Sequence, residues 1–177
     1  MKDSLDFGKI IAYLLPGFVG LWGLSHYSWT VAHWFQLSGA EESSFDNVSF
    51  ILLGSLAFGV ILSAFRWLIF DCFLNQRVFK ISSLNVDFSK LAANEHMKQA
   101  LQLLIDNHYS YYQFYSAMAV AVPFSFACWL TSRQGLEPIH WLYAAIVLLT
   151  TLVLSLGAAD ALRKYLTRTT SLFSSTT

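Results

Sequence analysis

The chain has 177 residues, of which 12% are charged, 55% are hydrophobic and 16% are aromatic. A soluble domain carries about 25% charged residues, so this composition argues against a water-soluble globule and against intrinsic disorder. The 11 Lys and Arg residues balance the 11 Asp and Glu residues, which removes the strongly basic character of many nucleic-acid binders. The composition indicates a membrane protein.

A helix that crosses the hydrocarbon core of a bilayer needs about 20 mainly apolar residues. We expect four such helices, at residues 10–27, 50–70, 112–130 and 141–159. The alternative, in which these segments are buried helices of a soluble bundle, leaves too few polar residues to make a wet surface. The predicted fold class is therefore all-α: an integral membrane protein with four transmembrane helices, the third of which extends into the cytosol.

The Lys and Arg residues predict the orientation of these helices. The loop at 36–49 contains none, and the loop at 131–140 contains only Arg133, whereas both chain ends and the segment after Phe70 are rich in them. Because Lys and Arg accumulate in cytoplasmic segments, we expect a multi-pass membrane protein with both termini in the cytoplasm. The expected parts are a first transmembrane pair (1–70), a cytosolic segment (71–111), a second transmembrane pair (112–159) and a cytosolic tail (160–177).

Small residues recur at short intervals on the first two predicted spans. Gly17 and Gly20 are three residues apart, and Ser55, Gly59 and Ser63 follow one another at intervals of four. Small residues at such spacings let helix backbones approach closely in lipid. These faces either pack the spans within one chain or make subunit contacts in an oligomer.

Arg66 lies within the second predicted span, where an Arg is costly unless it snorkels to the membrane surface or pairs with an acid. We expect a pair with Asp160, with Asp71 as the competing partner. Arg66 and Asp160 are candidates for lining a pore or forming a gate. The alternatives are that Arg66 snorkels to the membrane surface or that it forms a purely structural buried pair. Thr150 and Thr151 are further pore candidates, although such hydroxyl groups more often bond their own helix backbone.

The third span is predicted to belong to one long helix that starts in the cytosol near residue 90. No Pro or Gly interrupts the chain from there to Pro123. One face of the helix carries a stripe at intervals of three and four, made of Met97, Leu101, Leu104, His108, Tyr111 and Tyr115. We expect this stripe to pack against the segment at 71–88, against the same stripe of a neighbouring subunit, or against both.

The stretch from His108 to Tyr115 packs five aromatic residues, a His and a Gln into two helical turns where the third span begins. Tyrosines at this level are typical anchors at the membrane surface. A second interpretation is a collar, including Tyr112, that senses a ligand by ring stacking. The stripe and this collar are the candidates for sensing a signal or a partner in the cytosol.

Catalytic motifs are missing from the sequence. It contains no His-x-x-x-His, Cys-x-x-Cys, Gly-x-Ser-x-Gly or P-loop pattern. We therefore expect no enzyme, no cofactor and no metal site.

The opening DFGKIIAYLLPGF and the stretch HYSYYQFY resemble a family of small, mostly uncharacterised bacterial four-span membrane proteins. The layout also looks like that of the small membrane effectors of anti-phage defence systems. In those systems a cytosolic partner senses infection, and a multi-span protein then permeabilises or depolarises the inner membrane. This likeness lies in the architecture and carries no functional residues with it.

We expect an oligomeric inner-membrane effector that is ion-permeable or membrane-perturbing and is gated through its cytosolic segment. The alternative is a non-conducting membrane anchor or scaffold that recruits a cytosolic partner. The expected partners are the lipid bilayer, further copies of the chain, and a cytosolic protein or nucleotide-type trigger. Direct binding of nucleic acid is not expected.

Overall fold

The computed structural model describes residues 7–35, 45–79, 81, 95–133 and 137–174. Within these ranges the chain is helical apart from short connections, and it contains no strand. The α-helices are α1 (Phe7–Leu24), α2 (Trp29–Phe35), α3 (Phe45–Arg66), α5 (Glu95–Leu104), α6 (Ser110–Thr131) and α7 (Pro138–Ser174). Two π-helical segments continue the helices that precede them, namely η1 (Trp67–Val78) and η2 (Ile105–Tyr109). The expectation of an all-α chain is confirmed.

Three helical rods are long and apolar enough to cross a membrane. They span Asp46–Val78, Glu95–Thr131 and Pro138–Ser174, whereas the apolar helix at Ile10–Leu24 is shorter. At 1.5 Å per residue, each of the two 37-residue rods is about 55 Å long and exceeds the roughly 30 Å of a bilayer core. These rods therefore have the length to cross a bilayer and to project beyond it.

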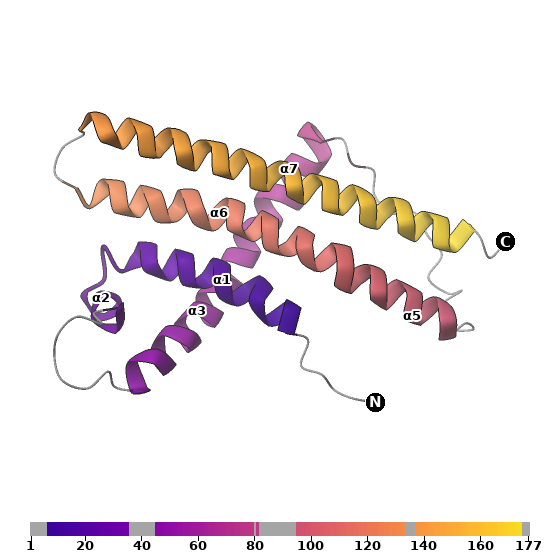
Figure 1. The fold of residues 1–177 in the computed structure, drawn as a ribbon, viewed down its shortest axis with the longest axis horizontal. Helices are drawn as coiled ribbons and strands as arrows, with labels where there is room; N and C mark the ends of the chain where they lie inside the picture. Colours follow the sequence, from indigo (N-terminus) through magenta and orange to yellow (C-terminus); the bar gives the residue numbers. More distant parts are fainter. Residues whose placement is uncertain (1–6, 36–44, 80, 82–94, 134–136, 175–177) are drawn as a thin grey trace.

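The rods form a layer of neighbouring helices with one oblique member (Figure 1). Helices α1 and α6 lie side by side and run in the same direction, and α7 runs back along α6 (Figure 1). The rod formed by α3 and η1 crosses the others at an angle and contacts α1 and α6. The first residues of α1 and the last residues of α7 lie towards the same end of the molecule (Figure 1).

Several predicted boundaries need correction. The first apolar helix ends at Leu24, where a turn leads into α2, so it does not continue to residue 27. The second rod runs on from residue 70 to Val78, and the fourth continues through the predicted tail to Ser174. The prediction of one continuous helix leading into the third span is confirmed from Glu95 to Thr131. Its expected start near residue 90 lies outside the described residues.

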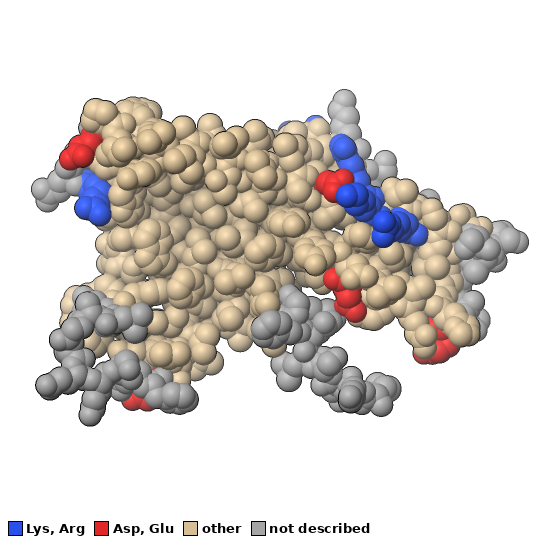
Figure 2. All heavy atoms as spheres, viewed as in Figure 1, with Lys and Arg blue, Asp and Glu red and all other residues tan. Residues whose placement is uncertain are grey.

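The molecule exposes apolar side chains over much of its surface, where a soluble protein exposes polar ones. Charged side chains gather towards the two ends, and a broad uncharged surface separates them (Figure 2). On α7, residues 138–159 carry no charge over a length of about 33 Å, and apolar side chains such as Leu148 (73% exposed) and Leu149 (62% exposed) face outwards. An apolar surface of this extent marks contact with lipid or with other chains.

The crossing of α1 with α3 depends on glycine. A methyl group on Gly17 would overlap the backbone carbonyl of Ser55, and one on Gly59 would overlap the carbonyl of Tyr13. Gly20 packs against the side chain of Phe58 in the same crossing. Gly17, Gly20 and Gly59 are thus used for packing α1 against α3 within one chain. Ser63, the last residue of the predicted small-residue face, is half-buried.

Candidate functional site

A buried polar cluster joins the end of α3 and the start of η1 to α6, and Arg66 lies at its centre. Arg66 is the last residue of α3, and only 6% of its surface is exposed. Its guanidinium lies 3.5 Å from the Asp71 carboxylate and 5.4 Å from the centre of the Tyr112 ring. The Arg thus has an acidic partner and an aromatic face, which offset the cost of a charge within an apolar rod.

Asn75 completes what we call the Arg66 cluster (Arg66, Asp71, Asn75 and Tyr112). The Tyr112 hydroxyl donates a hydrogen bond to Oδ1 of Asp71 and accepts one from Nδ2 of Asn75 at 2.8 Å. Nδ2 of Asn75 also lies 3.2 Å from Oδ1 of Asp71. Asp71 and Asn75 are neighbours on the surface of η1 because they are four residues apart, so both reach the same hydroxyl group of α6.

The cluster leaves part of its hydrogen-bonding capacity unused. Nε of Arg66 and Oδ1 of Asn75 are buried and have no hydrogen-bond partner in the described part of the chain, and Nη1 of Arg66 meets Asp71 in the 3.5 Å ion pair without a hydrogen bond. A buried polar atom without a partner costs about 1–3 kcal/mol, and a charged one costs more. The Arg66 cluster is therefore a set of groups that can gain bonds by moving or by admitting water.

Both helical rods that contribute to the Arg66 cluster contain a π-helical segment at or beside it. η1 carries Asp71 and Asn75, and η2 ends three residues before Tyr112. The wider turn of η1 is visible in the bond from the N–H of Phe79 to the carbonyl of Leu74, five residues earlier. Such segments are rare and occur often at functional sites, so the coincidence of two of them at one polar cluster singles out this place in the molecule.

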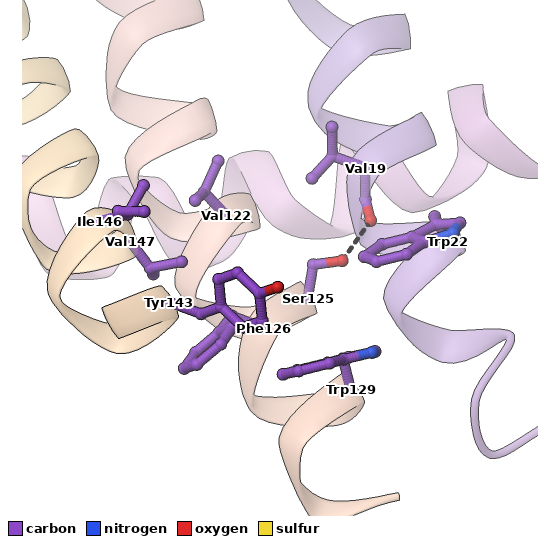
Figure 3. Close-up of a pocket in the computed structure, with 9 residues that line it drawn as sticks. All are labelled: Val19, Trp22, Val122, Ser125, Phe126, Trp129, Tyr143, Ile146 and Val147. Carbon is purple, nitrogen blue, oxygen red and sulfur yellow. Dashed lines mark hydrogen bonds between the residues drawn. The ribbon is translucent and has the colours of Figure 1, made fainter. Parts of the chain in front are cut away.

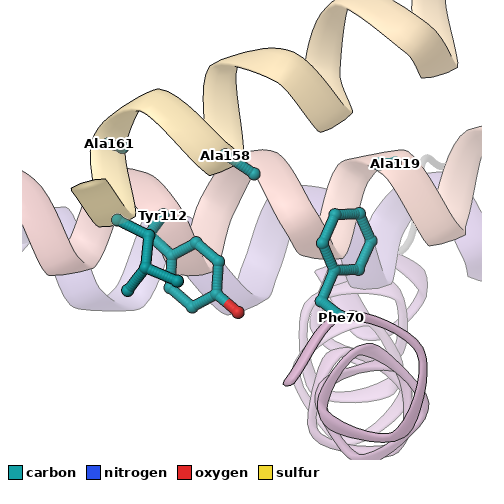
Figure 4. Close-up of a cluster of buried hydrophobic side chains, with 6 residues drawn as sticks. Phe70, Tyr112, Ala119, Ala158 and Ala161 are labelled. Atoms are coloured by element: carbon teal, nitrogen blue, oxygen red, sulfur yellow. The ribbon is translucent and has the colours of Figure 1, made fainter. Parts of the chain in front are cut away.

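Phe70 of η1 fills the space beside the Arg66 cluster. Its side chain is 2% exposed and belongs to an apolar cluster that also includes Tyr112, Ala119 and Ala158. Figure 4 shows η1 end on, with the Phe70 ring pointing towards α6 and α7. Alanines on these helices leave the room that the ring occupies, so Phe70 couples the oblique rod to the α6–α7 pair.

The other predicted pore residues do not gather at Arg66. Asp160 forms an exposed pair with Lys164 at 2.7 Å, so the expected Arg66–Asp160 pair is wrong and Asp71 takes its place. The Thr151 hydroxyl donates to the Val147 carbonyl of its own helix at 2.8 Å, and Thr150 is exposed on α7. One turn of η1 brings Asp71 back to Arg66, whereas Asp160 is exposed on α7 and pairs with Lys164.

The predicted sensing residues divide between two places. Tyr112 is buried in the Arg66 cluster, whereas His108, Tyr111 and Tyr115 line a groove between α6 and α7 with a volume of about 470 Å³. Asp160 is also in the wall of this groove. The eight-residue stretch is thus not a single collar, because successive residues of a helix face different neighbours.

The stripe on the long helix is covered by a part of the chain that we did not expect. The C-terminal half of α7 packs against α5 and η2, whereas we predicted that the segment at 71–88 or another subunit would cover the stripe. Residues 80 and 82–88 of that segment lie outside the described residues. Met97 is buried, and Leu101 and Leu104 are half-buried. The matching stripe on α7 consists of Ala158, Ala161, Leu162, Tyr165, Thr169 and Phe173.

A second pocket, wholly apolar, lies towards the opposite end of the molecule between α1, α6 and α7 (Figure 3). Its volume is about 320 Å³, and the rings of Trp22, Trp129 and Tyr143 are part of its wall. The Ser125 hydroxyl donates its proton to the Val19 carbonyl at 2.7 Å, so it can meet a ligand only as an acceptor (Figure 3). The pocket has the chemistry to accept an apolar chain and nothing more specific.

Sequence reasoning missed Phe70 and Asn75 as members of this region. The sequence after residue 70 is mixed and irregular and indicated a short helix followed by an extended turn, so the continuation of the rod to Val78 was not expected. The interval of four residues between Asp71 and Asn75, continuing the rod that contains Arg66, is the signal that could have placed them on one face.

Comparisons of the chain with protein-family models, with curated proteins and with solved structures give no significant match. The geometry of the Arg66 cluster therefore carries the functional interpretation.

Proposed function

We propose that the chain is a bacterial inner-membrane protein that crosses the bilayer four times, with α1 as the fourth crossing helix. In support, α1 has 18 residues, or about 27 Å, and lies beside α6. Of the described Lys and Arg residues near α6 and α7, only Arg133 lies in the connection between these two helices. Lys98, Lys164 and Arg168 lie towards the opposite end of the molecule. By the positive-inside rule, the latter end and both termini face the cytoplasm.

Within that membrane, the proposed function is that of a gated effector that makes the bilayer permeable to ions. The observation that carries this proposal is Arg66: a buried charge with unsatisfied nitrogens, held by side chains from two different rods. Charged residues inside membrane-spanning helices commonly mark ion pathways and gates. The Arg66 cluster acts as a latch, because separating η1 from Tyr112 would expose Arg66 and Asp71 to entering water.

The proposed trigger acts from the cytosolic end. Helices α5 and α6 form one continuous rod with η2, so a displacement at Glu95–Leu104 is transmitted to Tyr112. A cytosolic protein or a nucleotide-type molecule would supply this displacement. The arrangement is similar to that of the membrane effectors of anti-phage defence, in which a cytosolic sensor activates a small multi-span protein.

The proposed effector is oligomeric, but its subunit contacts differ from those expected from the sequence. Gly17 and Gly20 of α1 pack against α3, Gly23 packs against Ser125 of α6, and the stripe of α5 is covered by α7. The apolar outer faces of α3 and α7 remain for contacts between copies, with side chains such as Leu53 and Leu148. An ion path would form between copies, or where η1 separates from α6 and α7.

Ion flux through the purified chain in liposomes, together with membrane potential in cells that express it, tests this proposal. Tyr112→Phe keeps the ring but removes the hydroxyl that binds Asp71 and Asn75, so it should raise basal flux severalfold at unchanged particle mass. Tyr111→Phe is the matched control, since Tyr111 is 54% exposed and lies outside the Arg66 cluster. Arg66→Leu should also change the flux.

The scaffold alternative predicts a different result. A non-conducting anchor would leave the membrane potential unchanged in the wild type and in every variant, and it would copurify with a soluble partner. Absence of flux from the wild type, Tyr112→Phe and Arg66→Leu, with all three folded, would therefore reject the effector.

A further inference from the structure

The groove between α6 and α7 has a polar end and an apolar end. His108 of η2 and Lys164 of α7 line the polar end, and Tyr115, Val153 and Leu154 line the apolar end. We call this feature the interfacial groove. Because α7 rises 1.5 Å per residue, the two ends are separated by roughly 15 Å along the helix.

The polar end of the interfacial groove carries more positive than negative charge. Lys164 contributes a cation that pairs with Asp160 at 2.7 Å, and Arg168 donates a hydrogen bond to Nε2 of His108 at 2.6 Å. Among the described residues, the two cations Lys164 and Arg168 thus lie near the one carboxylate of Asp160. The Lys164 side chain is 55% exposed, so it can reach a ligand without unfolding the helix.

The apolar end is open because α7 has Gly157 there. A methyl group at this position would lie 3.6 Å from the Tyr115 ring, which is an ordinary contact, so the glycine is not required for packing. Its missing side chain instead leaves room beside Tyr115. Val153, which lines this end of the groove, is 60% exposed and lies in the charge-free part of α7 at 138–159.

From these features we infer that the interfacial groove binds an anionic phospholipid, with the phosphate at Lys164 and Arg168 and the first part of an acyl chain beside Gly157 and Val153. Basic pockets between membrane helices on the cytoplasmic side have the charge that anionic headgroups require. A soluble phosphate compound shares the headgroup chemistry, but it would gain nothing from the apolar end. This inference depends on the chain being in a membrane and not on its conducting ions.

Binding of short-chain phosphatidylglycerol to the full chain in detergent, measured by native mass spectrometry, tests the inference. Each surface cation contributes about 1 kcal/mol to attraction of anionic lipid, so the double variant Lys164→Gln/Arg168→Gln should bind about thirtyfold more weakly. Arg133→Gln removes an exposed cation at the opposite end of α6 and should leave the binding unchanged. Gly157→Leu should block the groove while Gly157→Ala retains most of the binding.

Three further probes separate the sources of the phosphate. Short-chain phosphatidylcholine, inorganic phosphate and AMP should each bind far more weakly than phosphatidylglycerol. Equal binding of phosphatidylcholine would remove the role of charge, and tight binding of phosphate or AMP alone would remove the role of the acyl chain. Either result, or unchanged phosphatidylglycerol binding in the double variant, would overturn the inference.

Discussion

The crossing of α1 with α3 and the junction of η1 with α6 and α7 hold the chain together by different means. At the crossing, backbones touch through Gly17 and Gly59, and no larger residue fits without separating the helices. At the junction, long side chains meet: Phe70 reaches towards α6 and α7, and Tyr112 bonds Asp71.

The difference concerns how each contact can change. A close contact between two helix backbones allows only one arrangement, because a small displacement either creates an overlap or opens a gap. A contact between polar side chains can exchange partners, since rotamers can turn and water can replace a protein group. The α1–α3 crossing is therefore the fixed part of the molecule, and the Arg66 cluster is the adjustable part.

The largest effect is expected from Gly17→Leu at the crossing. Its side chain would overlap the backbone at Ser55, so the helices must separate, at a cost of more than about 3 kcal/mol, and little folded protein should be recovered from membranes. Gly157→Ala, where the added methyl group fits, is the control for glycine replacement and should melt as the wild type does. A stable Gly17→Leu protein would show that the crossing is not fixed.

The second-largest effect is expected from removing the carboxylate of Asp71 from the Arg66 cluster. Asp71→Ala leaves the buried Arg66 without a counter-charge and should destabilise the chain by about 3 kcal/mol in detergent unfolding. Asp160→Ala breaks an exposed pair with Lys164 and should cost less than about 1 kcal/mol. If the two losses are equal, Arg66 is not held by its pair with Asp71.

Much of this architecture could be predicted from the sequence, because lipid imposes simple requirements. The apolar stretches located the three long rods, and the small residues at Gly17 and Gly59 indicated close helix contact. The partner of Arg66 could not be selected in the same way. Its choice between Asp71 and Asp160 depends on the side of α7 that faces η1, which hydropathy does not encode.

The helix after residue 160 was missed for a related reason. Its buried face is made partly of Ala161 and Thr169, which are too small or too polar to stand out as an apolar stripe. Its partner α5 carries the stronger pattern, so the sequence indicated that something covers Met97 without indicating what. The pairing of α5 with α7 depends on the contact faces of both helices, and only the face on α5 forms a clear apolar stripe in the sequence.

An intermediate effect is expected from Ala158→Leu at the junction. Ala158 is fully buried beside Phe70, so the larger side chain should clash with the ring and cost about 2 kcal/mol in thermal unfolding. The double variant Phe70→Ala/Ala158→Leu refills the space and should be less destabilised than the sum of the single variants. Additive losses would mean that the two residues do not share one space.

The smallest effect is expected from Tyr112→Phe. It keeps the buried ring and loses two hydrogen bonds, one of them to a carboxylate, so it should cost about 1.5 kcal/mol in detergent unfolding. Tyr111→Phe should change stability by less than about 0.5 kcal/mol. A Tyr112→Phe chain as stable as the wild type would show that Asp71 and Asn75 readily find other partners, which would make the adjustable part looser than the geometry suggests.

The oblique course of α3 has a consequence for the bilayer itself. A rod that leans across its neighbours fits its apolar length to the hydrocarbon thickness by changing its tilt, at a cost of fractions of a kcal/mol per Å of mismatch. Arg66 lies within this rod, so in the proposed four-span arrangement thinner or thicker membranes, made by shortening or lengthening the acyl chains, would change the tilt of the rod that holds Arg66. Membrane thickness would thereby act on the Arg66 cluster directly.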